Sequence, residues 1–376
     1  MKRMLLFMPA LILFLAACSP KATATPVATL PATEEILFTP TEEPIPEGAI
    51  VVTDALGREV ILPSAPQRII ITGKGLSLVA DAVYTFPGAV DKVIGLGNAA
   101  QGAVNFLQLL DPDFIKKAIL TNDATAEQIA ALSPDLLILK SSSAERLGPS
   151  LDAISMPVIY VDFETPDQYA RDLAILGQIF ENEARANELI AYYQDRVDEI
   201  SAAVAGTAKP RVLLLYYSEK DGTVAFNVSP VNWMQTLMVE MAGGEAAWKD
   251  ASLGFNWTTV TLEQIAAWDA DKIFIVNYAQ DPANVVTTLK ADPSWQALRA
   301  VQMNELYAFA GDIYSWDQPD PRWSLGLSWL ASRLHPDLFP DYDATTEVQE
   351  FYQFMYGMEA AYIETNILPT FKGDLP

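Results

Sequence analysis

Aromatic side chains gather where predicted strands end in the second half of the chain. Tyr217 ends the apolar run RVLLLYY, Tyr278 follows IFIVN, and Trp233 opens the next predicted helix. Tyr314 and Trp316 lie further on, in GDIYSWDQPDPR. Any single ring of this kind is more often part of a core, but a cluster at strand ends predicts contact with a ligand. Flat, amphipathic rings suit a large planar or macrocyclic molecule, because they offer much contact area for little lost side-chain entropy.

Two polar candidates follow predicted strands in the first half. Lys74 lies between Gly73 and Gly75, after QRIIIT and before a predicted helix. Backbone donors and an ammonium at a helix start would suit an anionic group. A turn with one solvated lysine explains the same residues equally well. Asn98 ends the run KVIGLGN and is the second candidate.

One short pattern occurs twice, as TAEQIAALSPDLLIL from Thr125 and as TLEQIAAWDADKIFI from Thr261. In each copy a threonine is followed three places later by a glutamine, which predicts a capping box at a helix start. The box does not need the acid inside it, Glu127 or Glu263, although a carboxylate in the first turn gains about 0.3–1 kcal/mol from the helix dipole. Two copies of a capped helix followed by a buried strand predict two similar α/β halves.

The rare residues exclude most metal and catalytic centres. His335 is the single histidine and Cys18 the single cysteine, so a site with several imidazoles and a disulfide within the chain are both ruled out. The sequence contains no Gly-x-Ser-x-Gly elbow and no phosphate-binding loop. We therefore expect no enzyme activity, no cofactor and no protein-bound metal centre.

The charge balance of the chain is strongly acidic. Its 376 residues include 48 Asp and Glu against 24 Lys and Arg, which gives a formal net charge of -24. With 51% apolar residues, the chain can bury a large core and divide into more than one domain. No basic run follows the first residues, which argues against a nucleic-acid partner. An acidic, exported monomer fits this composition better.

The N-terminus carries a predicted export signal over residues 1–17. Lys2 and Arg3 precede an apolar run that is too short to span a bilayer as a permanent helix. The run ends in LAAC, which resembles the lipobox of bacterial lipoproteins, so Cys18 is expected to become a lipid-bearing N-terminus. Residues 18–48 are rich in Thr, Pro, Ala and Glu, which predicts a disordered tether from the membrane surface to the folded body.

The folded body is predicted to be α/β with mainly parallel sheets. Residues 49–165 alternate strand-like apolar runs with helix-length segments and form the first lobe. In residues 166–205, apolar residues recur at three- and four-residue steps, which predicts one rigid helix, about 55 Å long, between the lobes. The alternation restarts in residues 206–376, which form the second lobe with its C-terminal helices.

The order of these motifs resembles one known family. VTDALGREVILP with PQRIIIT, KVIGLGN, the two EQIAA copies, EMAGG and PDPRWSLGLSWLASRLHPDLFP follow one another as in cluster-A (class III) substrate-binding proteins of ABC importers for ferric siderophores, haem and cobalamin. The likeness covers residues 51–371, and its motifs are loose singly but specific in this order. It implies two lobes joined by one rigid helix, a ligand held in the cleft, and delivery to a permease dimer.

The resemblance also implies roles for particular residues. In the family's cobalamin-binding member, one glutamate on each lobe pairs with arginines of the permease, and Glu127 and Glu263 correspond to these. Stabilisation of the helix starts is a compatible structural role. Cleft residues of that member correspond to Thr121 and Trp257; it has tryptophan at both, so Thr121 departs from the pattern and weakens the case for a corrin. Arg322, in a Pro-Arg pair before a helix, is a candidate structural residue.

The sequence therefore predicts an extracytoplasmic, lipid-anchored protein that binds an iron–siderophore, haem or cobalamin-type chelate and delivers it to an ABC importer. Two alternatives stay open: another solute, such as an oxyanion at Lys74, and a surface lipoprotein with a protein partner. The single helix is expected to allow only a small closure of the lobes. The complete set of expected ligand-binding residues is Lys74, Asn98, Thr121, Tyr217, Trp233, Trp257, Tyr278, Tyr314 and Trp316.

Overall fold

A computed structural model of the chain describes residues 45–73, 75–97, 105–121, 123–251 and 254–375. The predicted signal segment 1–17, Cys18 and most of the predicted tether 18–48 lie outside the described residues, as do Lys74 and Asn98. The residues from Ile45 onward make up one structural unit. None of the helices in these ranges is long and apolar enough to cross a bilayer.

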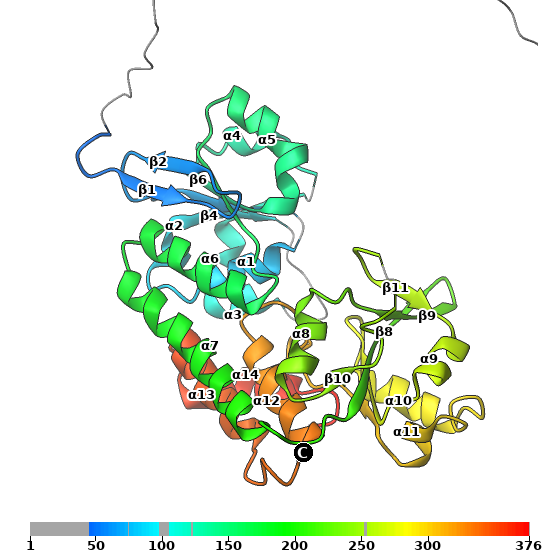
Figure 1. Cartoon of the computed structure of the whole chain (residues 1–376). Helices are drawn as coiled ribbons and strands as arrows, with labels where there is room; N and C mark the ends of the chain where they lie inside the picture. Colours follow the sequence, from blue (N-terminus) through cyan, green and yellow to red (C-terminus); the bar gives the residue numbers. More distant parts are fainter. Residues whose placement is uncertain (1–44, 74, 98–104, 122, 252–253, 376) are drawn as a thin grey trace, which may run out of the picture. The chain divides into compact units, whose positions relative to one another are not determined.

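The first lobe, at the top of Figure 1, is built on a five-stranded parallel sheet. Its strand order is β5-β4-β3-β6-β7. Alternate residues of its strands face two separate cores, as the two-residue period of a strand requires. Ile70 and Leu137 pack with α4 and α5 on one face, whereas Ile69 and Leu136 belong to the large core on the other. The strands are β3 (Ile69–Ile71), β4 (Val93–Gly97), β5 (Ala118–Leu120), β6 (Leu136–Lys140) and β7 (Val158–Val161).

Short helices and one hairpin complete this lobe. The hairpin of β1 (Ile50–Thr53) and β2 (Glu59–Leu62) is antiparallel. Its turn is held by Asp54, which accepts hydrogen bonds from the backbone N–H groups of Leu56 and Arg58. The helices are α1 (Leu76–Val83), α2 (Ala89–Lys92), α3 (Phe106–Leu110), α4 (Ala126–Ala130) and α5 (Ala144–Ala153), with short 3-10 turns at Phe114–Lys116 and Ser141–Ser143.

The second lobe has a mixed sheet with strand order β11-β9-β8-β12-β13, and β10 also pairs with β8. Its centre is parallel, because β8 pairs in parallel with β12 and β12 with β13, whereas β9 and β11 are antiparallel. The predicted α/β class is thus confirmed. The strands are β8 (Arg211–Lys220), β9 (Thr223–Val228), β10 (Glu245–Ala246), β11 (Thr258–Val260), β12 (Lys272–Val276) and β13 (Leu306–Ala308); the helices are α8 (Met234–Met241), α9 (Leu262–Trp268), α10 (Pro282–Ala291) and α11 (Arg299–Gln302).

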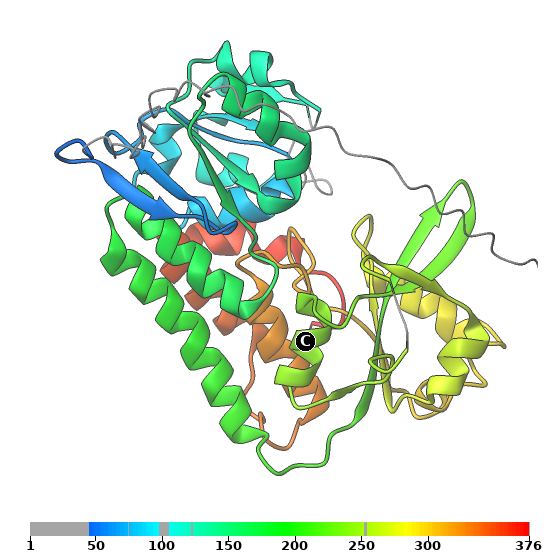
Figure 2. The ribbon, with the colours of Figure 1, turned by 45° about the horizontal axis from the view of Figure 1, so that its top comes forward.

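The single helix expected over residues 166–205 is wrong in its extent. The segment forms two helices, α6 (Pro166–Ile179) and α7 (Glu183–Ala203), which lie side by side as a helical hairpin (Figure 2). Glu181 turns the chain with a positive φ of 51°, and Asn182 caps α7 by accepting a hydrogen bond from the Arg185 N–H. The connection between the lobes is therefore the 21-residue α7, and not a helix of twice that length.

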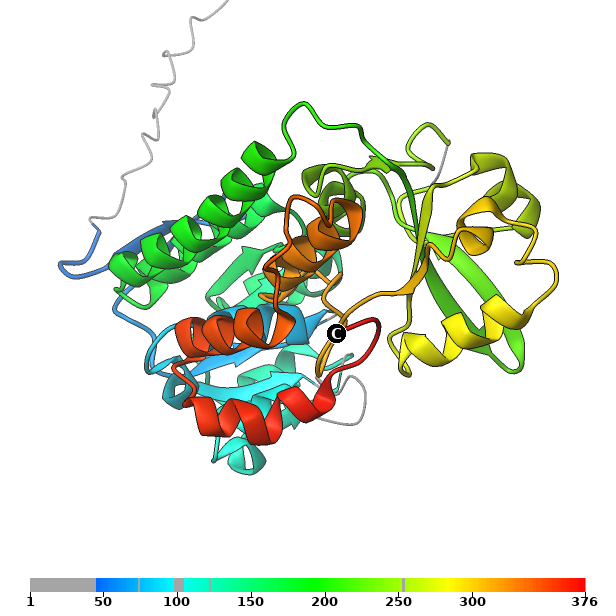
Figure 3. The ribbon, with the colours of Figure 1, turned by 90° about the horizontal axis from the view of Figure 1, so that it is seen from below.

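The C-terminal helices, which the sequence placed with the second lobe, contact the first. They are α12 (Trp323–Leu334), α13 (Ala344–Tyr356) and α14 (Ala360–Asn366), followed by a 3-10 turn at Leu368–Thr370. Tyr356 donates a hydrogen bond to the Asp81 carbonyl in α1, and Tyr362 donates one to the Leu109 carbonyl in α3. Figure 3 shows α13 and α14 alongside the first lobe. The first and the last segments of the unit that begins at Ile45 thus both contribute to this lobe.

Candidate functional site

Four aromatic rings from four segments of the second lobe meet near the carboxyl end of β12, whose last residue, Val276, pairs with Tyr216. Tyr216 lies on β8, Trp233 is the N-cap of α8, Trp257 precedes β11, and Tyr278 follows β12. The Trp257 ring centroid lies 5.1 Å from that of Tyr216, 5.8 Å from Trp233 and 6.4 Å from Tyr278. All four side chains are partly exposed. We call these four residues the aromatic cluster; it includes three of the predicted ligand residues, together with Tyr216.

A buried carboxylate holds one ring of the aromatic cluster, that of Tyr278. Asp317 is inaccessible to solvent and accepts hydrogen bonds from Tyr278 Oη at 2.6 Å, Ser315 Oγ at 2.6 Å and Gln235 Nε2 at 3.3 Å. Burial, and then the nearby Asp317 charge, raise the pKa of Tyr278 well above its ordinary value. The Tyr278 hydroxyl therefore stays protonated and keeps donating to Asp317, which holds its ring in place.

Three other predicted aromatic residues lie elsewhere. Tyr217 is next to Tyr216 in β8 and so points to the opposite face of the sheet, where it packs edge-on against Phe226 at 5.7 Å. Tyr314 and Trp316 are 2% and 0% exposed, and the Trp316 ring packs against Phe371. In this structure they belong to the core beneath the site and do not line an open surface.

The strand ends of the first lobe contribute polar groups. Thr121 is exposed directly after β5, where its hydroxyl lowers the pKa of Asp123. Lys140 ends β6, and its buried ammonium pairs with Glu164, which follows β7. The Lys140–Glu164 pair was missed by the sequence analysis, because a lysine after an apolar strand looks like an ordinary solvated residue. Its burial depends on chain segments that meet only in the fold.

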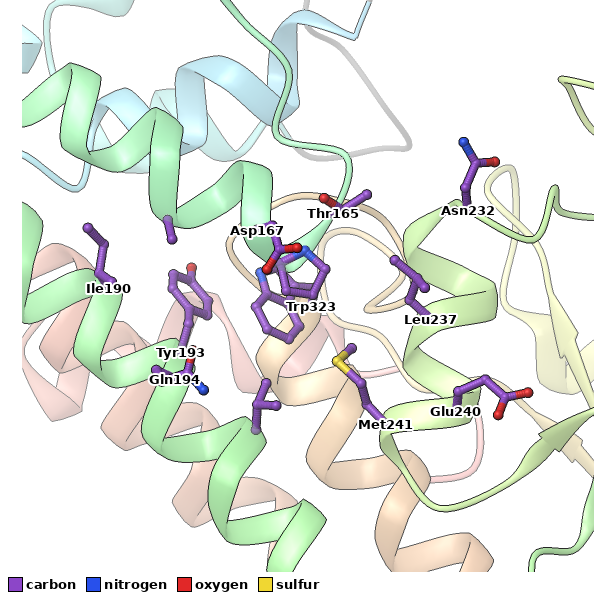
Figure 4. A pocket seen from close by; sticks show the side chains of 13 residues that line it. Thr165, Asp167, Ile190, Tyr193, Gln194, Asn232, Leu237, Glu240, Met241 and Trp323 are labelled. Atoms are coloured by element: carbon purple, nitrogen blue, oxygen red, sulfur yellow. The ribbon is translucent and has the colours of Figure 1, made fainter. Parts of the chain in front are cut away.

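A cavity of about 480 Å³ lies between the helical hairpin and the second lobe (Figure 4). Trp323 forms its floor; this side chain is fully buried, and its Nε1 has no hydrogen-bond partner in the described part of the chain. None of the predicted ligand-binding residues that the structure describes lines this cavity. The cavity is formed by segments that are distant in the sequence, and their apolar residues could not be told from core residues in the sequence alone. The lining residues are Thr165, Pro166, Asp167, Ala170, Ile190, Tyr193, Gln194, Val197, Asn232, Leu237, Glu240, Met241 and Trp323.

Buried polar contacts join the two lobes near this cavity. Arg322 Nη1 lies 2.8 Å from Asp81 Oδ2 in α1, and both side chains are inaccessible to solvent. The guanidinium also lies over the Phe106 ring of α3, 4.1 Å from its centroid. Tyr169 and Tyr193 of the hairpin donate hydrogen bonds to carbonyls of the segment before Arg322. These contacts agree with a structural role for Arg322.

The two repeated helix starts are alike in the structure. Both capping boxes predicted from the sequence are present, at Thr125 in α4 and at Thr261 in α9. Glu127 and Glu263 are exposed, and hydrogen bonds at the helix start lower the pKa of each carboxyl group. Each lobe therefore presents one ionised glutamate on a capped helix. Within the described ranges, no group of three or more His, Cys, Asp or Glu side chains is arranged to hold a metal ion.

Comparison with known proteins agrees with this geometry. The model of the periplasmic binding protein family matches residues 76–312, which is more than half of the chain. The crystal structure of a periplasmic solute-binding protein from Veillonella parvula has a TM-score of 0.67 and 26% identity, covering 86% of this chain and 99% of its own. The Haemophilus influenzae molybdate-binding protein MolA, solved with molybdate, has a TM-score of 0.68 at 18% identity and covers 82% and 98%.

Sequence relatives with named ligands are similarly distant. MolA of Haemophilus influenzae is 22% identical over 81% of this chain and 90% of its own length. The achromobactin-binding periplasmic protein of Dickeya dadantii is 25% identical over 69% and 84%. A vitamin B12-binding protein of Yersinia pestis is 27% identical over 37% of this chain and 48% of its own.

Two α/β lobes are linked by a helix, with polar groups at the strand ends of the first lobe and an aromatic cluster in the second, as in a two-lobed binding protein. The chain belongs to the periplasmic binding protein family, as the resemblance to cluster-A proteins predicted. It is a solute-binding protein of the ABC importer type, and proteins of this family are substrate-binding proteins and not enzymes. The family also implies a location outside the cytoplasm.

Proposed function

We propose that this protein captures a metal chelate of the iron–siderophore, haem or cobalamin type between its lobes and delivers it to an ABC importer. The aromatic cluster carries this proposal, because its four partly exposed rings lie together near the carboxyl end of β12. The buried Asp317 already holds Tyr278, so little side-chain freedom remains to be lost when a ligand binds.

The named relatives support a bulky chelate as ligand. One is described as binding achromobactin and others as binding vitamin B12. The similarity to the vitamin B12-binding protein extends over only 37% of this chain. The resemblance to the family also implies a tryptophan for a cobalamin-binding member at the position where this chain has Thr121. We therefore favour an iron chelate over a corrin within this class.

A free oxyanion is the second candidate ligand. The molybdate-binding protein MolA is similar over 90% of its own length, which is a longer match than that to the vitamin B12-binding protein. The buried ammonium of Lys140 at the end of β6 offers a positive charge to such an ion. A small oxyanion would, however, leave most of the aromatic cluster without contact.

Two further parts of the proposal concern the membrane. Lipid on Cys18, with residues 18–48 as tether, would keep the protein at the membrane surface. Glu127 and Glu263 would each contact one subunit of a two-fold permease, which would explain why the capped helix is duplicated. Exposed charge pairs of this kind mainly set orientation and encounter rate.

A ligand panel tests the binding proposal. We expect a ferric catecholate, ferric citrate, haem, cobinamide or molybdate to raise the melting temperature, because a ligand at a hundredfold excess over its dissociation constant adds about 2.7 kcal/mol of stability. W257A should weaken chelate binding about 30-fold, since truncating a central tryptophan of a binding surface costs about 2 kcal/mol or more. Y362A, which removes an exposed ring of α14 outside the aromatic cluster, is the control. If no compound in the panel binds, the proposal is wrong.

A further inference from the structure

The ion pair between Lys140 and Glu164 is unequal in its exposure. The Lys140 side chain is only 6% exposed, whereas that of Glu164 is 40% exposed. The pair bridges the ends of two neighbouring parallel strands, because Lys140 ends β6 and Glu164 comes three residues after Val161, the last residue of β7. A buried ammonium is rare unless it is paired. Here its partner is a carboxylate that can turn out into solvent.

A second buried lysine of the same lobe shows how this fold satisfies a structural ammonium. Lys117, 9% exposed, lies 3.1 Å from the Asp111 carboxylate, which is itself 1% exposed. It also donates hydrogen bonds to the carbonyls of Val90 and Val93. Lys117 thus has three fixed partners, one for each N–H of the ammonium. For Lys140, the described residues provide only Glu164 as a hydrogen-bond or ion-pair partner, and the Glu164 side chain is 40% exposed.

The surroundings of Lys140 are narrow and contain further donors. A Cβ added to Gly75 would lie 3.2 Å from Lys140 Cδ, and one added to Gly73 would lie 2.9 Å from Ser143 Oγ, so both glycines permit a close approach. The Ser141 Oγ is buried and has no hydrogen-bond partner in the described part of the chain. The next residue after Glu164 is Thr165, which lines the cavity of Figure 4. Glu164 is thus the sequence neighbour of one cavity-lining residue, and the pair lies at the carboxyl ends of β6 and β7, the edge at which open α/β sheets bind ligands.

We propose that Lys140 is the counter-ion for an anionic oxygen of the ligand, and that Glu164 occupies this position when no ligand is bound. When the ligand binds, its anionic oxygen pairs with the Lys140 ammonium, and the Glu164 side chain rotates away from Lys140 toward solvent. The ligand class is thereby narrowed to solutes that carry exposed anionic oxygens, either a free oxyanion or the carboxylates or catecholates of a metal chelate. This inference rests on the proposed function and names the charge of its ligand.

The two members of the pair then have opposite effects on binding. Removing the ammonium with K140Q should lower the affinity for an anionic ligand by about tenfold or more, because the substitution removes a charge-assisted hydrogen bond to the ligand. Removing the competing charge with E164Q should instead raise the affinity for the same ligand several-fold. A purely structural pair predicts no such opposition, since both substitutions would lower stability and neither would tighten binding.

Isothermal titration with molybdate, ferric citrate and cobinamide tests the inference. Molybdate is a free oxyanion, ferric citrate carries carboxylates, and the periphery of cobinamide is amide. K116Q is the matched control, because Lys116 is 71% exposed and pairs with an equally exposed aspartate. K140Q/E164Q removes both charges together; circular dichroism and its melting temperature show that the fold persists, and its anion affinity should remain as low as that of K140Q.

Each outcome decides between the two proposals. Weaker binding by K140Q and tighter binding by E164Q, for molybdate or for ferric citrate, supports the inference and identifies the source of the anion. Equal anion affinity in all variants overturns it and leaves the proposed function intact. If the protein binds cobinamide but neither anion, the inference about Lys140 is wrong and the proposed function stands. If none of the three compounds and no other member of the panel binds, the proposed function fails as well.

Discussion

The buried residues that join the two lobes include more carboxylates than cations. Asp81, Asp312 and Asp320 surround Arg322, and all four side chains are inaccessible to solvent. One guanidinium cannot neutralise three carboxylates. Burial, partly opposed by Arg322, raises the pKa of Asp81 to about 6 and that of Asp320 to about 7. The folded protein therefore holds protons here that the unfolded chain would release.

This imbalance makes stability depend on pH. The pKa of Asp320 is about 7 in the folded protein against 3.8 ordinarily, so its contribution to stability is full at low pH and is lost as the pH rises through about 7. We expect D320N to lose less stability than the unaltered protein between about pH 4 and pH 8. The difference should be about 1–4 kcal/mol, since one pKa unit corresponds to about 1.4 kcal/mol.

Urea unfolding at both pH values measures the effect of D320N. D195N, at an exposed position of α7, is the control and should follow the unaltered protein. Parallel pH dependence in D320N and the unaltered protein would show that Asp320 is already ionised in the folded state.

At the scale of elements, the helical hairpin depends on one close contact. A Cβ added to Gly177 in α6 would lie 2.6 Å from the Ala186 Cβ in α7, which is closer than real Cβ atoms approach. Two effects therefore oppose each other in a Gly177→Ala substitution. Alanine favours a helix over glycine by about 1 kcal/mol, whereas overpacking costs about 1–3 kcal/mol.

We expect the steric effect to prevail, so that G177A lowers the free energy of unfolding by about 1–2 kcal/mol. G148A is the matched control. Gly148 is also inside a helix, α5, but the nearest atom to its added Cβ is a tyrosine hydroxyl at 3.3 Å. Urea unfolding should therefore show little change or a gain for G148A. Equal stabilisation by both alanines would contradict the tight contact between α6 and α7.

At the scale of the whole molecule, each lobe carries the same surface feature, a capped helix start with an exposed glutamate. α4 and α9 begin with the same capping box and expose Glu127 and Glu263, one on each lobe. The duplication makes sense for a partner with two equivalent subunits. Loss of helix-dipole stabilisation is a minor effect for such exposed groups.

For the proposed docking, E127K/E263K should bind ligand with unchanged affinity but fail to support uptake into cells or proteoliposomes containing the importer. The control E188K/E199K makes the same change of charge at two exposed positions of α7 and should leave uptake intact. Normal uptake by E127K/E263K would remove the docking role and leave the glutamates as helix-start residues.

Local patterns predicted much of this structure. The capping boxes at Thr125 and Thr261 depend on residues three places apart, so the sequence alone identifies them. The alternation of apolar runs and helices likewise predicted both lobes. Trp233, Trp257 and Tyr278 do meet as a cluster, although only Tyr278 follows a strand of the parallel part of the sheet and Trp257 precedes the antiparallel β11.

Contacts between distant segments were not predictable in this way. The hairpin turn was missed because the apolar periodicity of α6 continues into α7, although Asn182 is a typical N-cap residue. Trp316 looked like a strand-end ring but is fully buried. Arg322 and Asp81 are separated by 241 positions in the chain, and no local sequence pattern predicts their ion pair.

The return of the chain's end to the first lobe has a consequence for its assembly. Phe106 in α3 packs its ring against Tyr314, Tyr352 and Tyr356, all from the last quarter of the sequence. A ribosome that has made only the first two hundred or so residues has therefore not yet supplied the partners that seal this ring from water. The amino-terminal half stays unfinished until synthesis is nearly over.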